Sequence, residues 1–107
     1  MANEFMMVYI TTSSEEEALE IASKVVDEKL AACANILPKM KSVYSWKGES
    51  FVDDEVVLIF KTVTSQFEQL KNRVIELHSY ELPCVVAIPI THGHEPYLHW
   101  LTEQTTK

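Results

Sequence analysis

The residues of this chain best suited to metal binding are its four histidines, and His92 and His94 are the closest pair. They flank Gly93, a spacing that lets two imidazole rings reach one copper or zinc ion. The alternative is that both histidines lie in a solvated turn and bind nothing. No part of the sequence has the dense Cys/His spacing of a structural zinc site. A chelating loop and a solvated turn are therefore both open interpretations of this pair, and a solvated turn is the more common one.

His78 is the third candidate metal ligand, and it stands at the expected end of a helix. A protonated imidazole at a helix C-terminus is favoured by the helix dipole, which gives this residue a structural alternative. Glu81 and Glu95 could add carboxylate oxygens to the histidine nitrogens. Copper and zinc are the cations that imidazole ligands of this kind suit.

A second polar pair, Glu55 and Lys61, lies six residues apart in a segment that reads as a strand, so both side chains project from one face. Their neighbours Val57 and Ile59 are apolar, and burying a charge among apolar groups is costly unless the charge is paired. One interpretation is a salt bridge between subunits. The other is the polar end of a ligand pocket, lined by Trp46, Tyr80 and Trp100.

No enzyme chemistry is evident in the sequence. The chain has two glycines and no glycine-rich phosphate loop, and no serine has the context of a nucleophile elbow. Cys33 and Cys84 each lie within an apolar strand pattern, which is typical of buried, unreactive thiols. We therefore expect a binding protein and not a catalyst.

The composition sets the class of protein. A chain of 107 residues with 47% hydrophobic content fits a single globular domain over 1–107. The net charge of −7 disfavours binding to nucleic acid or to anionic membranes, and no apolar run is long enough to span a bilayer. With no signal-peptide pattern and no disulfide framework, the expected location is the cytoplasm.

Hydrophobic periodicity and capping signals divide the chain into alternating strands and helices. The predicted strands cover 5–12, 32–46, 56–63 and 84–90, with a hairpin connection across 48–54. Ser13 and Ser14 are each followed after three residues by glutamate, and this doubled capping box begins a helix that we expect to end near Ala31. A similar box at Ser65 begins the second helix, and Pro96 begins a third that ends near Gln104.

The resulting order, βαββαβ plus a C-terminal helix, predicts an α+β, ferredoxin-like fold with an antiparallel sheet. Pro38 and Pro89 fall in the second and fourth strands, which are the edge strands of that fold and the places where proline is tolerated. The second strand continues past Pro38 without a turn signal, so we expect one long, bent strand that overhangs the sheet.

The strands are apolar on both faces, as in residues 6–10, 56–60 and 84–88. The helices can cover one face only, and a large exposed apolar patch is unusual on a monomer. The pattern therefore predicts a closed homo-oligomer, with the overhanging hairpin 41–51 reaching into a neighbouring subunit. The alternative is a monomer with a few apolar surface residues.

Five groups of residues match a known family in order along nearly the whole chain: 28–38 (EKLAACANILP), 42–48 (SVYSWKG), Glu55 with 61–62 (KT), 78–81 (HSYE), and Gly93 with 97–100 (YLHW). On these motifs the chain resembles the CutA-type divalent-cation tolerance proteins. The resemblance implies a homotrimer similar in build to the PII nitrogen-signalling proteins, a cytoplasmic location, and binding of copper or other divalent cations. It also places the matching residues near an inter-subunit cleft, namely Trp46, Glu55, Lys61, Tyr80 and Trp100.

The chain departs from one feature of the family. Some members are credited with a copper site made of a cysteine at the end of the first strand and two adjacent histidines. The matching positions here are Ile10, Leu77 and His78, so only one ligand is kept. We therefore expect metal binding through His92 or His94 across subunits, and the alternative function is a PII-like small-molecule or anion sensor that uses the cleft.

Overall fold

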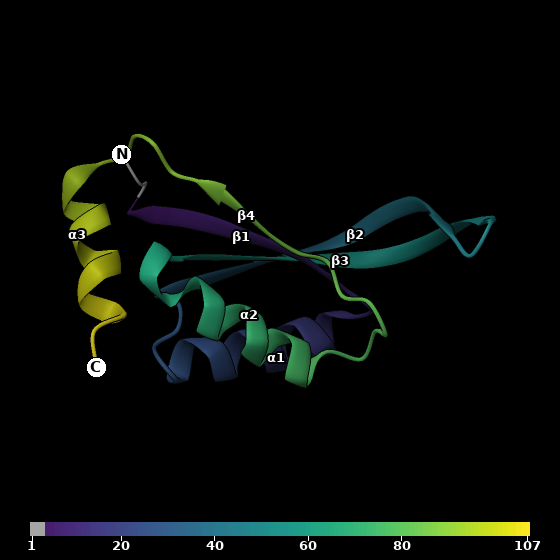
Figure 1. Ribbon diagram of the computed structural model, residues 1–107, viewed down its shortest axis with the longest axis horizontal. Helices are drawn as coiled ribbons and strands as arrows, with labels where there is room; N and C mark the ends of the chain where they lie inside the picture. The colour runs from purple at the N-terminus through teal and green to yellow at the C-terminus, as the bar shows by residue number, and fades with distance from the viewer. Residues whose placement is uncertain (1–3) are drawn as a thin grey trace.

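A computed structural model of the chain describes residues 4–107 (Figure 1). Residues 1–3, where a signal peptide would begin, lie outside the described part. The element order is the predicted one, with an added 3-10 turn before the second helix. The elements are β1 (Phe5–Thr12), α1 (Glu15–Asp27), β2 (Cys33–Trp46), β3 (Glu49–Val63), the 3-10 turn (Thr64–Gln66), α2 (Phe67–Leu77), β4 (Val85–Pro89) and α3 (Glu95–Gln104).

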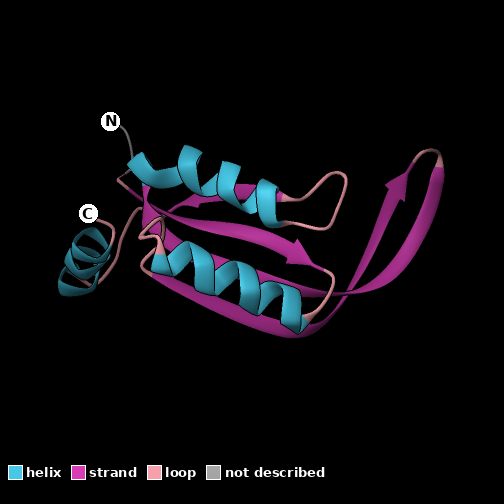
Figure 2. Ribbon diagram, turned by 90° about the horizontal axis from the view of Figure 1, so that it is seen from below, coloured by secondary structure: helices cyan, strands magenta, loops and turns pink. Residues whose placement is uncertain are grey.

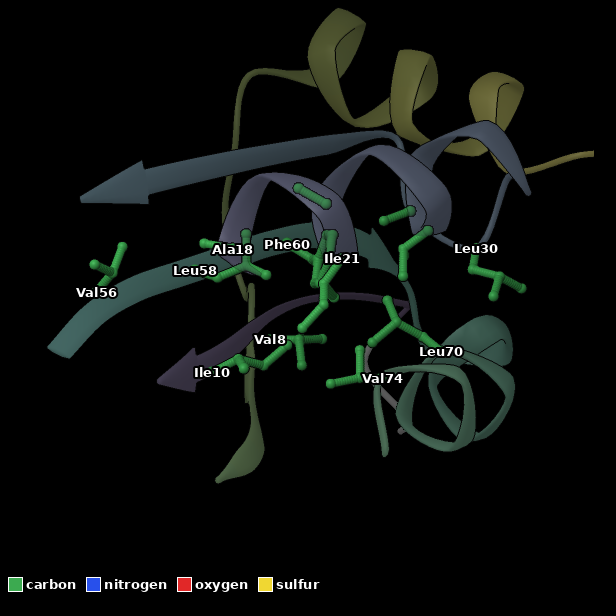
Figure 3. Close-up of a cluster of buried hydrophobic side chains, with 13 residues drawn as sticks. Val8, Ile10, Ala18, Ile21, Leu30, Val56, Leu58, Phe60, Leu70 and Val74 are labelled. Atoms are coloured by element: carbon green, nitrogen blue, oxygen red, sulfur yellow. The ribbon is translucent and has the colours of Figure 1, made fainter. Parts of the chain in front are cut away.

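The four strands form one sheet in the order β2-β3-β1-β4, and every neighbouring pair is antiparallel. Helices α1 and α2 lie side by side on one face of this sheet (Figures 1 and 2). The hydrophobic core lies between these two helices and the sheet. Its largest fully buried side chains include Phe60, Ile10, Ile21 and Leu70 (Figure 3). The ferredoxin-like prediction is therefore confirmed, including β2 and β4 as the edge strands.

The long second strand is confirmed, and β2 and β3 form a hairpin that extends well beyond the sheet (Figure 2). A register shift between Leu37 and Met40 marks a β-bulge, and Lys39 within it has a φ of 65°. A bulge bends its strand and increases the local twist. It therefore accounts for the angle at which the hairpin leaves the sheet.

The predicted hairpin connection across 48–54 is wrong, because β3 already begins at Glu49. The turn is only Lys47 and Gly48, with φ values of 50° and 82°, as the two central residues of a type I′ turn require. Asp53 and Asp54, which resemble turn residues, stay in the strand because they pair with Ser42 and Lys41 of β2 in the antiparallel ladder, and their side chains contact Tyr44 and Lys41.

Helix α1 begins as predicted and ends earlier. The Ser14 hydroxyl accepts the Glu17 N–H at 3.1 Å, which is the expected N-cap. The helix ends at Asp27 and not near Ala31, because Lys29 adopts a φ of 62° and the Leu30 N–H bonds back to the Val25 carbonyl. This is the left-handed closure that commonly ends helices.

The other element boundaries differ slightly from the predicted ones. Ser65 does not cap α2, since the chain is already coiled in the 3-10 turn and an N-cap needs extended backbone. Strand β4 is shorter than 84–90 and covers Val85–Pro89, although the Ile90 N–H still donates to the Phe5 carbonyl of β1 at 2.9 Å. Pro96 does lie in the first turn of α3, as predicted.

The sheet face opposite α1 and α2, here called the open face, is apolar, as predicted. It exposes Leu37 from β2 and Val86 and Ile88 from β4, with exposed fractions of 49%, 51% and 53%. Helix α3 lies at one end of the molecule and contacts β3 there, so it covers only that end of this face (Figure 1). None of the helices in residues 4–107 has both the length and the apolar character of a membrane-spanning segment.

Glu17 joins the start of α1 to the loop that follows α2. Its carboxylate accepts the N–H and the hydroxyl of Ser13 at 3.0 and 2.8 Å, and the N–H of Ser79 at 2.8 Å. Partial burial raises the pKa of this carboxyl, but the hydrogen bonds from Ser13 and Ser79 outweigh that effect and lower the pKa to about 2. The charged form of Glu17 therefore stabilises the fold.

We predict that Glu17→Gln lowers the free energy of unfolding by about 1–3 kcal/mol at pH 7. Because the pKa is lower in the folded state, the contribution is complete above the ordinary carboxyl range and is lost as the pH falls toward 2. Denaturant unfolding at pH 7, 5, 4 and 3, at one protein concentration, measures this. The control is Glu16→Gln, an exposed residue of the same helical turn. A gap between wild type and Glu17→Gln that stayed constant with pH would contradict the assignment.

Candidate functional site

The first part of the predicted cleft is a contact between β3 and the loop after α2. The hydroxyl of Tyr80 donates to Oε2 of Glu55 at 2.6 Å, and only 9% of Glu55 is exposed. Burial, together with this hydrogen bond to a carboxylate, raises the pKa of Tyr80 well above the usual range of a phenol. Glu55 therefore lies in the structure as a largely buried carboxylate with one oxygen held by Tyr80.

Lys61 lies on the same face of β3 as Glu55, as the strand period predicts, but near the C-terminal end of the strand. Six residues of extended chain separate the two by about 20 Å, so they form no salt bridge within this chain. The Lys61 ammonium group lies 5.7 Å from the centre of the Tyr97 ring, and that ring packs against Trp100 with centres 5.5 Å apart. This cation–π arrangement stabilises the charge where α3 crosses the end of the sheet.

Trp46, the fifth predicted cleft residue, lies at the tip of the hairpin, beside the Lys47 ammonium group at 5.6 Å. The five residues therefore occupy three separate places in one chain. Sequence reasoning missed Tyr97, although Tyr97 and Trp100 are three residues apart on α3 and such residues share a helix face.

Two hollows lie next to these places. One of about 390 Å³ lies beside Glu55, at the bulge where the hairpin leaves the sheet. Its lining residues are Ser13, Lys39, Lys41, Asp54, Glu55 and Val56. The other, of about 570 Å³, lies between α1, the start of β2 and Trp100, and includes Cys33. The first is lined by charges of both signs and the second mainly by small side chains.

The side chain of His78 is fully buried, and hydrogen bonds occupy both of its ring nitrogens. Nε2 lies 2.8 Å from the Thr11 carbonyl, which can only accept, so Nε2 carries the proton. Nδ1 accepts the N–H of Tyr80 at 3.1 Å. In this arrangement neither nitrogen offers a lone pair to a metal unless one of these bonds is broken.

His92 and His94 lie in the loop between β4 and α3, and both are exposed. Nδ1 of His92 is 2.9 Å from the Thr91 hydroxyl, while His94 is the N-cap residue of α3. Among the described residues, no three His, Cys, Asp or Glu side chains form a group that could hold a metal ion. A complete site built on this loop would therefore need ligands from a second subunit.

Cys33 and Cys84 are free and partly buried. Burial and the nearby Glu55 carboxylate raise the pKa of the Cys84 thiol, which disfavours the reactive thiolate.

Comparison with known proteins agrees with this architecture. Residues 6–104 match the family model for "CutA1 divalent ion tolerance protein". The chain is 50% identical to the divalent-cation tolerance protein CutA of Thermus thermophilus, over 92% of this chain and 96% of that protein. It is 44% identical to the chloroplastic protein CutA of Arabidopsis thaliana, over 94% of this chain but 55% of that relative, so it spans about half of the latter's length.

A solved structure is equally similar. The divalent cation tolerance protein Cut A1 from Thermus thermophilus superposes with a TM-score of 0.93 at 48% identity, covering 95% of this chain and 99% of that one. The range of the family-model match, residues 6–104, contains all five groups of residues that resemble the family. The chain belongs to the CutA1 divalent ion tolerance protein family.

Proposed function

We propose that this protein acts in divalent-cation tolerance, as a homotrimer that binds copper or another divalent cation. The observation that carries the proposal is the 50% identity, over 92% of this chain, to a relative named for divalent-cation tolerance. The proposed role is binding, because the relative is named for cation tolerance and not for a reaction.

The homotrimer is supported by the exposed surfaces of the sheet. Its open face is apolar, and its two edges, β2 and β4, are different strands with unpaired backbone groups. Pairing of one edge with the other edge of a neighbour is a heterologous contact, and such contacts close into a ring when the rotation allows. A ring of three would also give the overhanging hairpin a neighbour to pack against.

The cation site is proposed at the loop that carries His92 and His94, with ligands completed across subunits. Both imidazoles are exposed, and imidazole is a good ligand for copper and zinc. His78 could join only by giving up its bond to Thr11 or Tyr80, so we assign it the least weight of the three histidines.

A second candidate function is binding of a small anion at an inter-subunit cleft. One observation favours it: in the part of the chain that the structure describes, no salt-bridge partner is found for the half-buried Lys61. A trimer could bring Trp46 of one subunit and Glu55 with Tyr80 of another toward this cation. The cleft would then be complete only in the assembly.

The cytoplasm is the proposed location. Two free cysteines and no disulfide among the described residues suit a reducing compartment. The Arabidopsis relative is named as chloroplastic, so location varies within the family.

For the assembly, we predict that Ile88→Lys on the open face dissociates the trimer, because it places a charge in the proposed interface. The matched control is Ile75→Lys on the outer surface of α2, where the exposed fraction is similar, 48% against 53%. Sedimentation at micromolar protein measures the mass of both variants and of the wild type. A wild-type particle with the mass of one chain, or a trimer unaffected by Ile88→Lys, would overturn the proposal.

For the cation, we predict that the metal-free protein binds copper or zinc with micromolar or tighter affinity, and that His92→Ala with His94→Ala weakens binding at least about tenfold. Calorimetric titration measures the affinity. The control is His99→Ala, since this histidine is 75% exposed and lies on α3. Tight binding by the doubly substituted protein would show that the cation site is not at this loop.

For the cleft, we predict that Lys61→Ala abolishes any binding of ATP, ADP or inorganic phosphate. Lys71→Ala, which removes a lysine of α2 whose side chain is 33% exposed, should leave such binding intact. Calorimetry with the three anions on both variants tests this. If none of them binds the wild-type trimer, the anion-sensor candidate fails for these ligands while the cation proposal stands.

A further inference from the structure

The contact between Tyr80 and Glu55 depends on how the short loop after α2 is held. We propose that His78 is a positioning residue: together with Glu17 it fixes the backbone at 79–80, so that the Tyr80 hydroxyl stays on the Glu55 carboxylate. The inference rests on the proposed function only for the claim that Glu55 faces a ligand. The rest follows from contacts within this chain.

The hydrogen bonds of His78 fit the neutral imidazole in a single tautomer. Nε2–H donates to the carbonyl of Thr11 in β1, and Nδ1 accepts from the N–H of Tyr80. The ring therefore ties the sheet on one side to the loop on the other. Its face also packs against the ring of Tyr80, with centres 4.6 Å apart and planes inclined at 52°.

Glu17 holds the neighbouring residue of the same loop. Its Oε2 accepts the N–H of Ser79 at 2.8 Å and lies 3.8 Å from Nδ1 of His78. Two successive backbone N–H groups, of Ser79 and Tyr80, thus find their acceptors in side chains and not in regular secondary structure. Because the loop has no ladder of its own, these two bonds decide where Tyr80 points.

The position of Tyr80 determines how many carboxylate oxygens of Glu55 remain free to accept a hydrogen bond from a ligand. The phenol occupies Oε2, and Glu55 also lines the hollow of about 390 Å³ at the bulge. A carboxylate with one oxygen taken is a weaker and more directional acceptor than one with both oxygens free. His78 therefore acts on Glu55 through Tyr80, without touching the hollow itself.

The test uses three substitutions of His78 that separate its two hydrogen bonds. In His78→Asn, the side-chain oxygen can replace Nδ1 as acceptor for Tyr80. In His78→Gln, the amide nitrogen can replace Nε2 as donor to Thr11. His78→Ala removes both. The wild-type oligomer and each variant are studied by NMR without any ligand, and Tyr80→Phe identifies the hydroxyl proton signal of Tyr80.

We expect hydrogen exchange of the Tyr80 amide to become at least about tenfold faster in His78→Ala and His78→Gln, with loss of the hydroxyl signal. In His78→Asn, which keeps the acceptor for the Tyr80 N–H and loses the bond to Thr11, both changes should be smaller than in the other two variants. Unchanged amide exchange and a retained hydroxyl signal in His78→Gln would overturn the proposal. So would equal loss in all three variants, because the residue would then only fill space.

The outcome is independent of the proposed function, since no ligand enters the measurement. Exchange of core amides in α1, such as that of Val25, shows whether each variant is folded. If His78→Ala does not fold, the comparison of the Asn and Gln variants still decides the question. Failure of metal or anion binding would leave this result unaffected.

Discussion

The antiparallel ladder between β2 and β3 is the constraint on which the rest of the structure depends. It runs from Cys33 paired with Lys61 to Trp46 paired with Glu49, and only its first half has β1 as a third strand. The bulge after Leu37 separates the two halves. Beyond the bulge the hairpin is a two-stranded ribbon, and such ribbons are marginally stable alone in water. Its cross-strand contacts, including the stacked Tyr44 and Phe51 rings, hold it together.

The same ladder distributes the charged side chains along the open face. Strand β3 carries Glu55 where the sheet narrows into the hairpin and Lys61 where α3 crosses, with apolar residues between them. Tyr80 stabilises the first charge by a hydrogen bond and Tyr97 the second by its ring. Each charge therefore has a local aromatic partner, and neither requires the other for its stability. This arrangement leaves both charges at the rim of the apolar open face.

The helical side of the molecule supports that face through one loop. Glu17 lies in the first turn of α1 and His78 just after the last turn of α2, and the antiparallel packing of the two helices brings these ends together. Their side chains bond the backbone of 79–80, which then carries Tyr80 around the edge of the sheet to Glu55. The helix packing and the open face are thus connected by a chain of hydrogen bonds.

The fold class, the order of elements, the edge position of β2 and β4, and the apolar character of both sheet faces could be predicted from the sequence, because each follows from local periodicity and turn chemistry. The hairpin turn could not, since Asp53 and Asp54 are turn residues by type and remain in β3 only through contacts across the strand pair. The sequence could place Glu55 and Lys61 on one face, because the strand period is local. Three contacts were decided only by the tertiary structure, because each joins residues distant in sequence. They are the hydrogen bond between Tyr80 and Glu55, the packing of Lys61 against the Tyr97 ring, and the burial of His78 between β1 and the loop after α2.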